Sequence, residues 1–457
     1  MRRTVSLLVV ASTSWVVPSN SPAQQGRPPN IVVIVADDMG YADVGAYGGK
    51  DIPTPNIDAL AASGVRFTDA YVTGPFCGPT RAGLMTGRYP QRFGQEFNIG
   101  QMIEAHRDVG LPVDELTMAD RLRAAGYRTA LFGKWHLGTA DRFVPTKRGF
   151  DEFFGFLSGA HSYVAATPNV NPIYDGTERV GRIPYLTDTL TDRAVEFIQR
   201  NRARPFFLYL AYNAVHTPLQ ATDKYLARFP SIADQRRRSY AAMLSAMDDG
   251  VGRTMVALRD AQLDENTLIF FFSDNGGPLS PATWNGSSNG VLRGDKGDTW
   301  EGGIRVPFVI RWKGKIAEGR SDSRPIIQLD VLPTALAAAG VEVRPEWKLD
   351  GANLLPFVTG RATGAPHDAL YWRTGAIMAI RRGDWKLVKM LEDGTKHDPS
   401  ALNLDGAELY NVRQDVGETK NVAAAQRDKV QELRTAWERW NAGLVPPAWR
   451  SPVTERQ

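Results

Sequence analysis

The sequence predicts an α/β fold, in which a doubly wound and mostly parallel sheet is flanked by helices. Four short apolar runs lack the polar–apolar alternation of a half-exposed strand, which is typical of strands buried on both faces. Stretches with helical periodicity separate these runs, and such an alternation favours a parallel sheet. After about residue 360 the pattern changes, which predicts a smaller C-terminal antiparallel sheet with one helix.

The four apolar runs are the predicted central strands. They are contained in "NIVVIVADD", "YRTALFGKWH", "PFFLYLAYNAVH" and "NTLIFFFSDNGG". The predicted helices between them span residues 55–63, 116–125, 189–201 and 240–261. In folds of this kind, ligands bind at the carboxyl ends of the parallel strands. Polar residues at those ends are therefore the first candidates for a functional site.

Residues 361–457 are predicted to form a small α+β subdomain. "AIMAIRRGDWKLVKM" has the pattern of two strands joined by a turn at Arg382, Gly383 and Asp384. Residues 427–444 have the pattern of an amphipathic helix. We expect this unit to close over one side of a main, catalytic domain formed by residues 24–360.

The first residues are typical of an export signal. Arg2 and Arg3 precede a largely apolar stretch, and "NSPAQQ" offers a small-residue cleavage site near Ala23. This pattern predicts a signal peptide at residues 1–23, and a disordered or membrane-anchoring tail is the alternative. Since the apolar stretch is shorter than a bilayer span, we expect a periplasmic or secreted protein without a membrane span.

The charge balance argues against a nucleic-acid partner. The formal net charge is +4, from 54 basic and 50 acidic residues. Without Arg2 and Arg3 the balance is 52 against 50, or +2, which is too even for a nucleic-acid or membrane-surface footprint. The one dense run, at residues 236–238, is interpreted as the solvated face of a helix.

Polar side chains follow all four predicted strands. They are Asp37, Asp38, Lys134, His136, His216, Asp274 and Asn275. A turn, a helix cap or a structural histidine would explain each one singly, but their recurrence at strand ends favours a site. Three carboxylates and one amide suit Ca²⁺ or Mg²⁺ better than zinc or copper. With Arg81, Lys134 and Lys296 added, the set suits an anion bound beside a divalent ion.

Cys77 is the only cysteine among 457 residues. In an oxidising compartment, a thiol with no intramolecular partner is a buried residue, a link to another chain, or a reactive group. "CGPTRAGLMTG" has the pattern of a short helix, with Pro79 in the first turn and Gly87 at the end. Cys77 then lies at a helix N-terminus, where an anion is favoured, and Arg81 projects from the same side. These residues favour a cysteine nucleophile.

The segment "CGPTRAGLMTGRYP" resembles the signature of the formylglycine-dependent (type I) sulfatases, arylsulfatase-like members of the alkaline phosphatase superfamily. That signature is a cysteine or serine, any residue, a proline, a small residue and an arginine, followed by Thr-Gly-Arg. Thr80 stands where the family most often has serine. Eight further blocks resemble the family in the expected order: "PNIVVIVADDMGYADVGAYGG", "TPNIDALAASGVRFTDAY", "FGKWHLG", "VHTP", "FFSDNGG", "LRGDKGDTWEGGIRVP", "LDGANLLPFVTG" and "ELYNVRQDVGETKNVA".

The resemblance implies a sulfuric ester hydrolase with an alkaline phosphatase-like fold. In this family a formylglycine-generating enzyme oxidises the cysteine, and the hydrated aldehyde attacks the sulfur of a sulfate ester. The residues implied to hold Ca²⁺, or Mg²⁺, are Asp37, Asp38, Cys77, Asp274 and Asn275. The resemblance implies that Arg81 and His136 orient the hydrate, and that Lys134 and Lys296 bind the sulfate. It also implies that His216 protonates the leaving oxygen.

Three further residues are candidates for a substrate subsite. Gly159 falls where some relatives have a serine that contacts the sulfate, and His161 and Ser162 either line a subsite or cap their loop. Trp284 lies in a turn-rich loop at residues 278–290. It suits stacking on a sugar ring, and anchoring of the loop in the core is an equal alternative.

The implied substrate is a sulfate ester of a polysaccharide or oligosaccharide met outside the cell, or a small aryl sulfate. A phosphate or phosphonate ester hydrolase of the same superfamily would use the same metal site. An inactive sulfoglycan-binding relative would have lost a metal or nucleophile position, and the sequence keeps them all. Sulfate ester hydrolysis is therefore the favoured hypothesis.

Overall fold

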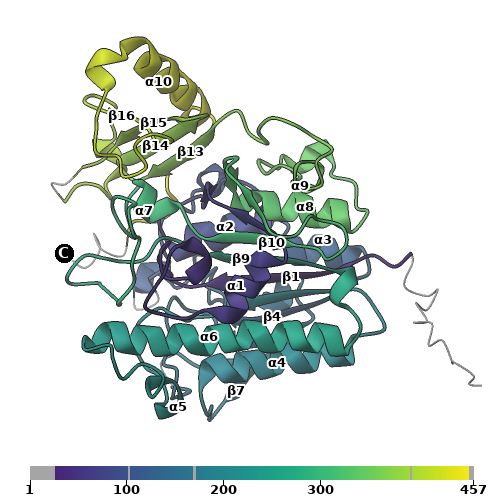
Figure 1. The fold of residues 1–457 in the computed structure, drawn as a ribbon. Coiled ribbons are helices and arrows are strands. Elements are labelled where there is room, and N and C mark those ends of the chain that lie inside the picture. Colours follow the sequence, from purple (N-terminus) through teal and green to yellow (C-terminus); the bar gives the residue numbers. More distant parts are fainter. Residues whose placement is uncertain (1–25, 101–102, 168–170, 392–393, 452–457) are drawn as a thin grey trace, which may run out of the picture.

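The computed structural model describes residues 26–100, 103–167, 171–391 and 394–451 of the protein. Within these residues, a large mixed sheet lies between two layers of helices, and a smaller four-stranded sheet with one helix adjoins one end of it (Figure 1). The predicted α/β class and the C-terminal antiparallel sheet are confirmed. The predicted signal peptide, residues 1–23, lies outside the described residues.

The large sheet is parallel at its centre and mixed towards its edges. Its strands are β1 Asn30–Ala36, β2 Val65–Phe67, β4 Arg128–Lys134, β5 Glu152–Phe156, β6 Ile173–Asp175, β7 Glu178–Val180, β8 Phe206–Ala211, β9 Thr267–Ser273, β10 Phe308–Arg311 and β11 Arg320–Asp322. Their order is β11-β2-β10-β9-β1-β8-β4-β5-β6-β7, and the block from β9 to β5 is parallel. The four predicted strands β1, β4, β8 and β9 make up this block together with β5.

Burial explains why these strands lack alternation. Every residue of β1, β8 and β9 is buried. Val32 and Ile34 of β1 belong to one hydrophobic cluster, and Ile31 and Val33 belong to another on the opposite face. Because both faces of the sheet are covered, apolar side chains are required at odd and even positions alike.

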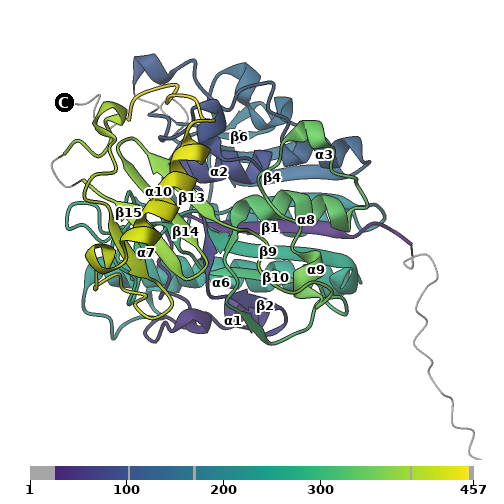
Figure 2. The same cartoon turned by 90° about the horizontal axis from the view of Figure 1, so that it is seen from above.

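The two helical layers cover opposite faces of the sheet (Figures 1 and 2). The helices are α1 Pro55–Ala62, α2 Cys77–Thr86, α3 Met118–Ala124, α4 Leu186–Arg200, α5 Asp223–Leu226, α6 Gln235–Asp260, α7 Glu301–Ile304, α8 Val331–Ala338, α9 Leu355–Val358 and α10 Arg427–Asn441. Helices α1, α4 and α6 pack on one face, and α2, α3 and α8 pack on the other. Helices are thus present at all the predicted places.

Capping residues move two helix starts away from the predicted ones. Helix α3 begins two residues later than predicted, because Thr117 and Asp120 form a capping box before it. Helix α6 begins five residues earlier, because the Asp234 side chain accepts a hydrogen bond from the Arg237 N–H. The arginine run therefore lies in the first turn of α6.

One arginine of that run is not solvated as predicted. The Arg237 side chain is 13% exposed and pairs with Asp43 at 2.6 Å and Asp51 at 2.7 Å. Asp43 is fully buried, and its charge requires a partner. Arg237 therefore ties α6 to the loop that follows β1, which sequence periodicity did not indicate.

The C-terminal subdomain is a four-stranded antiparallel sheet covered by α10. Its strands are β13 Leu370–Thr374, β14 Ile377–Arg382, β15 Trp385–Lys389 and β16 Glu408–Asn411. The predicted hairpin turn lies between β14 and β15, where Gly383 has a φ of 58°. Helix α10 packs on the sheet through Leu433 and Trp437, and ends three residues before the predicted position.

Buried contacts join this subdomain to the main body. The indole N–H of Trp372 donates to the Val72 carbonyl at 2.7 Å, next to the short pair β3 Ala70–Tyr71 and β12 Ile326–Ile327. The Lys386 ammonium, from β15, lies 2.9 Å from Glu301 and 2.8 Å from Glu418. These three charged side chains are all buried.

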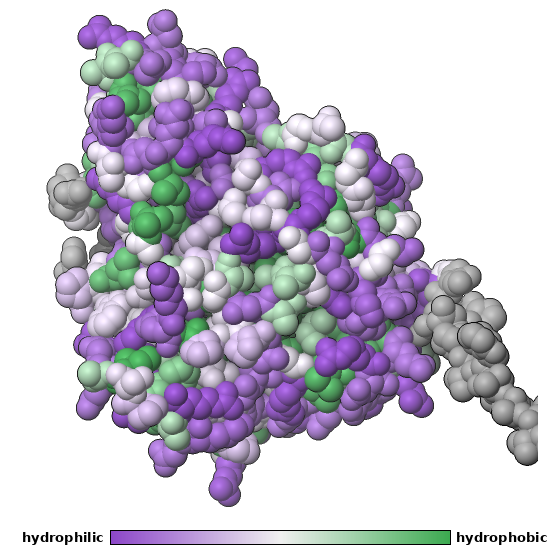
Figure 3. All heavy atoms as spheres, in the orientation of Figure 1, coloured by the Kyte–Doolittle hydropathy of each residue, from purple (hydrophilic) through white to green (hydrophobic). Residues whose placement is uncertain are grey.

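Hydrophobic residues form small separate groups among hydrophilic ones on the face shown in Figure 3. No helix in the described parts of the chain combines the length and the apolar character needed to cross a bilayer.

Candidate active site

Three carboxylates meet at the carboxyl ends of β1 and β9. Asp37 and Asp38 follow β1, and Asp274 follows its parallel neighbour β9. The backbone N–H of Asp38 donates to the Asp274 carboxylate at 3.2 Å. Asp38 has a φ of 62°, a left-handed conformation that costs about 1 kcal/mol or more and is common at functional sites. All three carboxylates are buried.

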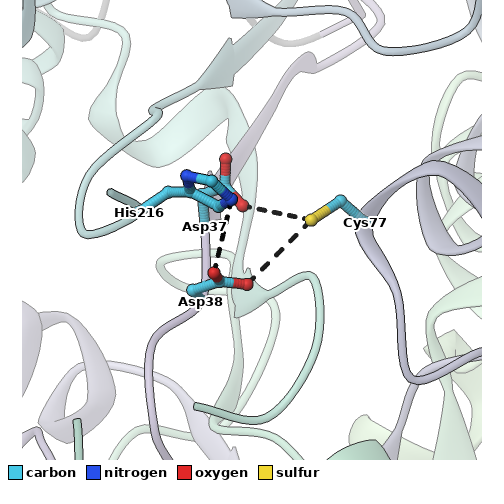
Figure 4. Close-up of side chains that lie close together, drawn as sticks. All are labelled: Asp37, Asp38, Cys77 and His216. Atoms are coloured by element: carbon cyan, nitrogen blue, oxygen red, sulfur yellow. Dashed lines mark hydrogen bonds and ion pairs between the residues drawn. The ribbon is translucent and has the colours of Figure 1, made fainter. Parts of the chain in front are cut away.

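Cys77 is the first residue of α2 and points at the carboxylates of Asp37 and Asp38 (Figure 4). Its Sγ lies 3.4 Å from Asp37 Oδ1 and 4.0 Å from Asp38 Oδ1. The next backbone N–H, that of Gly78, donates to Asn98 Oδ1 at 2.8 Å. Gly87 ends the helix with a φ of 68°, as its place in the sequence predicts. Cys77 itself is 1% exposed.

Each carboxylate has a cationic partner. Lys134 Nζ lies 2.7 Å from Asp37, and Lys296 Nζ lies 2.7 Å from Asp38. The Arg81 guanidinium lies 2.7 Å from Asp274. Lys296 Nζ also lies 3.5 Å from the sulfur of Cys77. Three negative and three positive charges thus surround the cysteine.

His216 faces the same group with one ring nitrogen. Its Nδ1 lies 2.6 Å from the Thr217 carbonyl, so this nitrogen carries the proton, and its Nε2 lies 3.5 Å from Asp38. Burial lowers the pKa of His216, although Asp38 opposes that shift. Nε2 is therefore the unprotonated ring nitrogen, and it faces Asp38.

His136 is buried and lies close enough to the cluster for the charges of Lys134, Arg81 and Asp37 to act on it. Burial and then Lys134 hold its pKa well below the ordinary value of histidine. Its Nε2 lies 3.4 Å from the Ile99 carbonyl. A Cβ atom added to Gly159 would lie 2.8 Å from that same Nε2. Glycine at residue 159 therefore makes room for the His136 ring, and a serine there would require the ring to shift.

The charges of the site act on one another. Burial opposes ionisation of Asp37, but Lys134, His216 and Arg81 hold its pKa well below the ordinary range. Burial and then the Asp274 carboxylate raise the pKa of the Cys77 thiol. At neutral pH the thiol is therefore protonated, and a protonated thiol is a weak nucleophile.

The oxygen atoms at this place fit a divalent cation. Asn275 donates through Nδ2 to Asp38 Oδ1 at 2.7 Å, while its buried Oδ1 accepts no hydrogen bond from any described residue. Ligating atoms of Asp37, Asp38, Cys77 and His216 lie within 4.8 Å of one another. A carboxamide oxygen that accepts no hydrogen bond lies beside clustered carboxylates here. Oxygen ligands of these kinds are the ones that Ca²⁺ and Mg²⁺ prefer.

A cavity of about 590 Å³ leads from the surface to this cluster. At its inner part are Asp38, His216 and Lys296, and its walls include Phe76 and Trp284. The Trp284 indole N–H donates to the Ser287 carbonyl at 3.0 Å. The ring is thus held by its own loop while one side lines the cavity.

The structure does not bring His161 and Ser162 to this cavity. The His161 ring is 3% exposed and contacts the Ser162 carbonyl at 2.6 Å and the Thr167 hydroxyl at 3.1 Å. The Ser162 hydroxyl donates to Gln220 at 3.0 Å. These contacts are those of the loop-capping alternative. The predicted catalytic and metal-binding residues, by contrast, all come to the same end of the sheet.

Three supporting residues were missed by sequence reasoning. The Tyr209 hydroxyl accepts a hydrogen bond from Arg81 at 3.3 Å. Asn285 donates to the Asp38 carbonyl at 3.3 Å, and Asn98 holds the start of α2 as described above. A tyrosine within an otherwise apolar buried strand was a signal for Tyr209. The two asparagines lie in irregular loops, where the sequence carries no comparable signal.

Comparisons with known proteins point to one family. The Sulfatase family model matches residues 29–341, and the model described as N-sulphoglucosamine sulphohydrolase, C-terminal, matches residues 294–436. N-acetylgalactosamine-6-sulfatase of Sus scrofa is 37% identical over 402 residues, which cover 83% of this chain and 74% of that protein. Arylsulfatase A of Homo sapiens is 35% identical over 453 residues, which cover 89% of this chain and 87% of that protein.

The solved structures agree with this result. The crystal structure of Ps i-CgsB in complex with k-i-k-neocarrahexaose superimposes with a TM-score of 0.85 at 38% identity. The match covers 94% of this chain and 96% of that one. Three findings agree: the family model matches more than half of the sequence, the relatives exceed 30% identity, and the fold is shared. The chain belongs to the sulfatase family of the alkaline phosphatase superfamily and is a sulfuric ester hydrolase.

Proposed function

We propose that this sulfatase removes sulfate from an extracellular polysaccharide or its oligosaccharides, with Cys77 converted to formylglycine and Ca²⁺, or Mg²⁺, beside it. The position of the Cys77 sulfur carries this proposal. It lies at the first residue of a helix, 3.4 Å from Asp37 and 3.5 Å from Lys296. The apolar and basic start of the sequence supports a periplasmic or secreted location.

The residues that would hold the ion are Asp37, Asp38, Asp274 and Asn275. A divalent ion would stabilise an ionised oxygen nucleophile and offset negative charge that develops on the sulfate group. The three carboxylates are already balanced by three cationic side chains. An added divalent charge therefore leaves the centre positive, which favours binding of an anionic ester.

In this proposal Lys134 and Lys296 bind the sulfate oxygens. Each ammonium has three N–H donors; Lys134 donates to Asp37, and Lys296 donates to Asp38 and to the Cys77 sulfur. Donors therefore remain for a sulfate group next to Cys77. Arg81 is held by Asp274 and by the Lys134 carbonyl, at 3.0 Å, and keeps the first turn of α2 in place.

In this proposal His216 protonates the leaving oxygen. Its Nδ1 proton is bound to the Thr217 carbonyl, so a proton for the leaving group must come from Nε2. Asp38, at 3.5 Å, stabilises the doubly protonated ring that this step requires. The ring also lines the cavity from which a substrate enters.

The cavity supports a saccharide as the group that carries the sulfate. Its volume of about 590 Å³ is in the range of sites for small organic ligands, and far exceeds one sulfate group. Trp284 offers an aromatic face to a sugar ring on one wall. That Ps i-CgsB has been solved with a neocarrahexaose supports the same class of substrate.

Mass spectrometry of the tryptic peptide at residues 67–81 tests the nucleophile. The protein is prepared from cells with and without a formylglycine-generating enzyme, and both samples are assayed on nitrophenyl sulfate and on sulfated oligosaccharides. We expect the aldehyde at Cys77 and hydrolysis in the first sample, and the thiol with at least about a hundredfold less activity in the second. Full activity with unmodified thiol would contradict the assignment of formylglycine as the nucleophile. Aldehyde at Cys77 without any hydrolysis would favour a sulfoglycan-binding protein.

A further inference from the structure

The three consecutive arginines at the start of α6 have different surroundings. Arg237 is paired with two aspartates, as described above. Arg238 is half-buried and donates to the Leu226 carbonyl at 3.3 Å. Arg236 is exposed and pairs with no carboxylate among the described residues. Its contacts are with the carbonyls of Pro281 and Trp284 at 3.4 and 3.5 Å, near the upper limit for a hydrogen bond.

Arg236 lines the cavity that reaches the reaction centre. The same cavity is bounded by Asp38, His216 and Lys296 at its inner part, and by Trp284 on the wall beside Arg236. A saccharide whose sulfate lies near Lys296 and whose ring lies near Trp284 would therefore extend past Arg236. The guanidinium is within reach of the substrate but outside the residues that surround Cys77.

The charges along the cavity leave Arg236 without a counter-ion. Lys296 is neutralised by Asp38 at 2.7 Å, and these two residues and Arg236 are the lining residues with full charges. A planar guanidinium binds a sulfate or carboxylate group through two parallel hydrogen bonds. Because its present contacts are long, Arg236 loses little when it turns towards such a group.

We propose that Arg236 binds a second anionic group of the substrate, carried by the sugar next to the one that loses its sulfate. The group is a further sulfate ester or a uronate carboxylate, which share the geometry that a guanidinium recognises. The inference rests on the proposed function and deepens it: the preferred substrate is a polyanionic saccharide. Arg236 would thus determine specificity and take no part in the chemical step.

Paired substrates with one backbone test this inference. We would measure kcat and KM for sulfated disaccharides with no second anion, with a second sulfate, and with a uronate. The readout is the ratio of kcat/KM between a doubly and a singly anionic substrate. The variants are Arg236→Gln, Arg236→Lys and, as a matched control from the same helix, Arg238→Gln.

We expect the native enzyme to prefer a doubly anionic substrate by about 10- to 100-fold, mainly through KM. Arg236→Gln should remove that preference, Arg236→Lys should keep part of it, and Arg238→Gln should keep it in full. The anion whose preference disappears in Arg236→Gln identifies the group that is bound. A native enzyme without preference, or an Arg236→Gln variant that retains it, would overturn the inference. An aldehyde-bearing enzyme that cleaves none of the substrates would instead overturn the proposed function.

Discussion

Lys134 and Asp37 form an ion pair that is fully withdrawn from water. Both side chains are 0% exposed and their charged atoms are 2.7 Å apart. Arg81 is the next cation to the same carboxylate, at 3.7 Å. Removal of one member of a buried pair leaves the other charge without compensation, which is far more costly than loss of an exposed pair.

We therefore expect Lys134→Met to lower the free energy of unfolding by about 3 kcal/mol. The same change should lower kcat/KM for a sulfate ester by about a hundredfold or more, because the donor proposed to bind the sulfate is lost. Denaturant unfolding and steady-state kinetics measure the two effects. Lys313→Met is the control, since Lys313 is 42% exposed and lies 3.5 Å from Asp264. Equal stability losses in both variants would contradict the role of burial.

Asn275 gives a separate test of the proposed ion site. Its buried Oδ1 has no donor among the described residues, so a cation is the partner that would satisfy it. We expect Asn275→Ala to raise the Kd for Ca²⁺ at least about tenfold, a loss typical even of outer partners at metal sites. Titration calorimetry of the chelator-treated protein measures this directly, with Asn266→Ala as a distant control. Unchanged Ca²⁺ affinity would exclude Asn275 as a ligand.

At the scale of elements, strands were predicted better than their surroundings. β1, β4, β8 and β9 are recognised because burial on both faces leaves unbroken apolar runs. The chemistry-bearing residues follow these strands directly, so a correct strand prediction also placed most of the site. The start of α6 was missed because a capping aspartate, and not apolar periodicity, determines it.

Contacts between distant loops could not be predicted in this way. The Asn285 amide reaches the Asp38 carbonyl across 247 positions of sequence. The burial of His161 and the pairing of Arg237 with Asp43 also depend on how loops cross over the strand ends. Such contacts follow from the assembled fold, and local patterns of polarity do not encode them.

At the scale of the whole molecule, one lysine is shared by two carboxylates where the C-terminal sheet meets the main body. Lys386 pairs with Glu301 and with Glu418, and all three are buried. Burial raises the pKa of Glu418 to about 7, because Lys386 only partly offsets it and Glu301 adds repulsion. The negative charge of an ionised Glu418 is therefore not fully compensated where the C-terminal sheet meets the main body.

The sign of the resulting pH dependence follows from the raised pKa of Glu418. Its protonated form stabilises the folded state fully below about pH 4.5, its value in an unfolded chain, and this contribution is lost as pH rises through about 7. We expect Glu418→Gln, which resembles the protonated form, to gain in Tm relative to the native protein between pH 5 and pH 8. Thermal unfolding across this range measures the difference, and exposed Glu438→Gln is the control. A difference that stays constant with pH would contradict the shifted pKa.

The burial of Cys77 also has a consequence for the order of events in the cell. A side chain that is 1% exposed, at the start of a helix packed beneath the sheet, is out of reach of any modifying enzyme once the chain has folded. Central pairing joins Ile31 of β1 to Phe207 of β8, 176 positions later, and pairing over such distances is slow. The proposed conversion of Cys77 would therefore compete with folding, and the fraction of active molecules would be decided before the chain has folded. A molecule that folds first would keep its thiol.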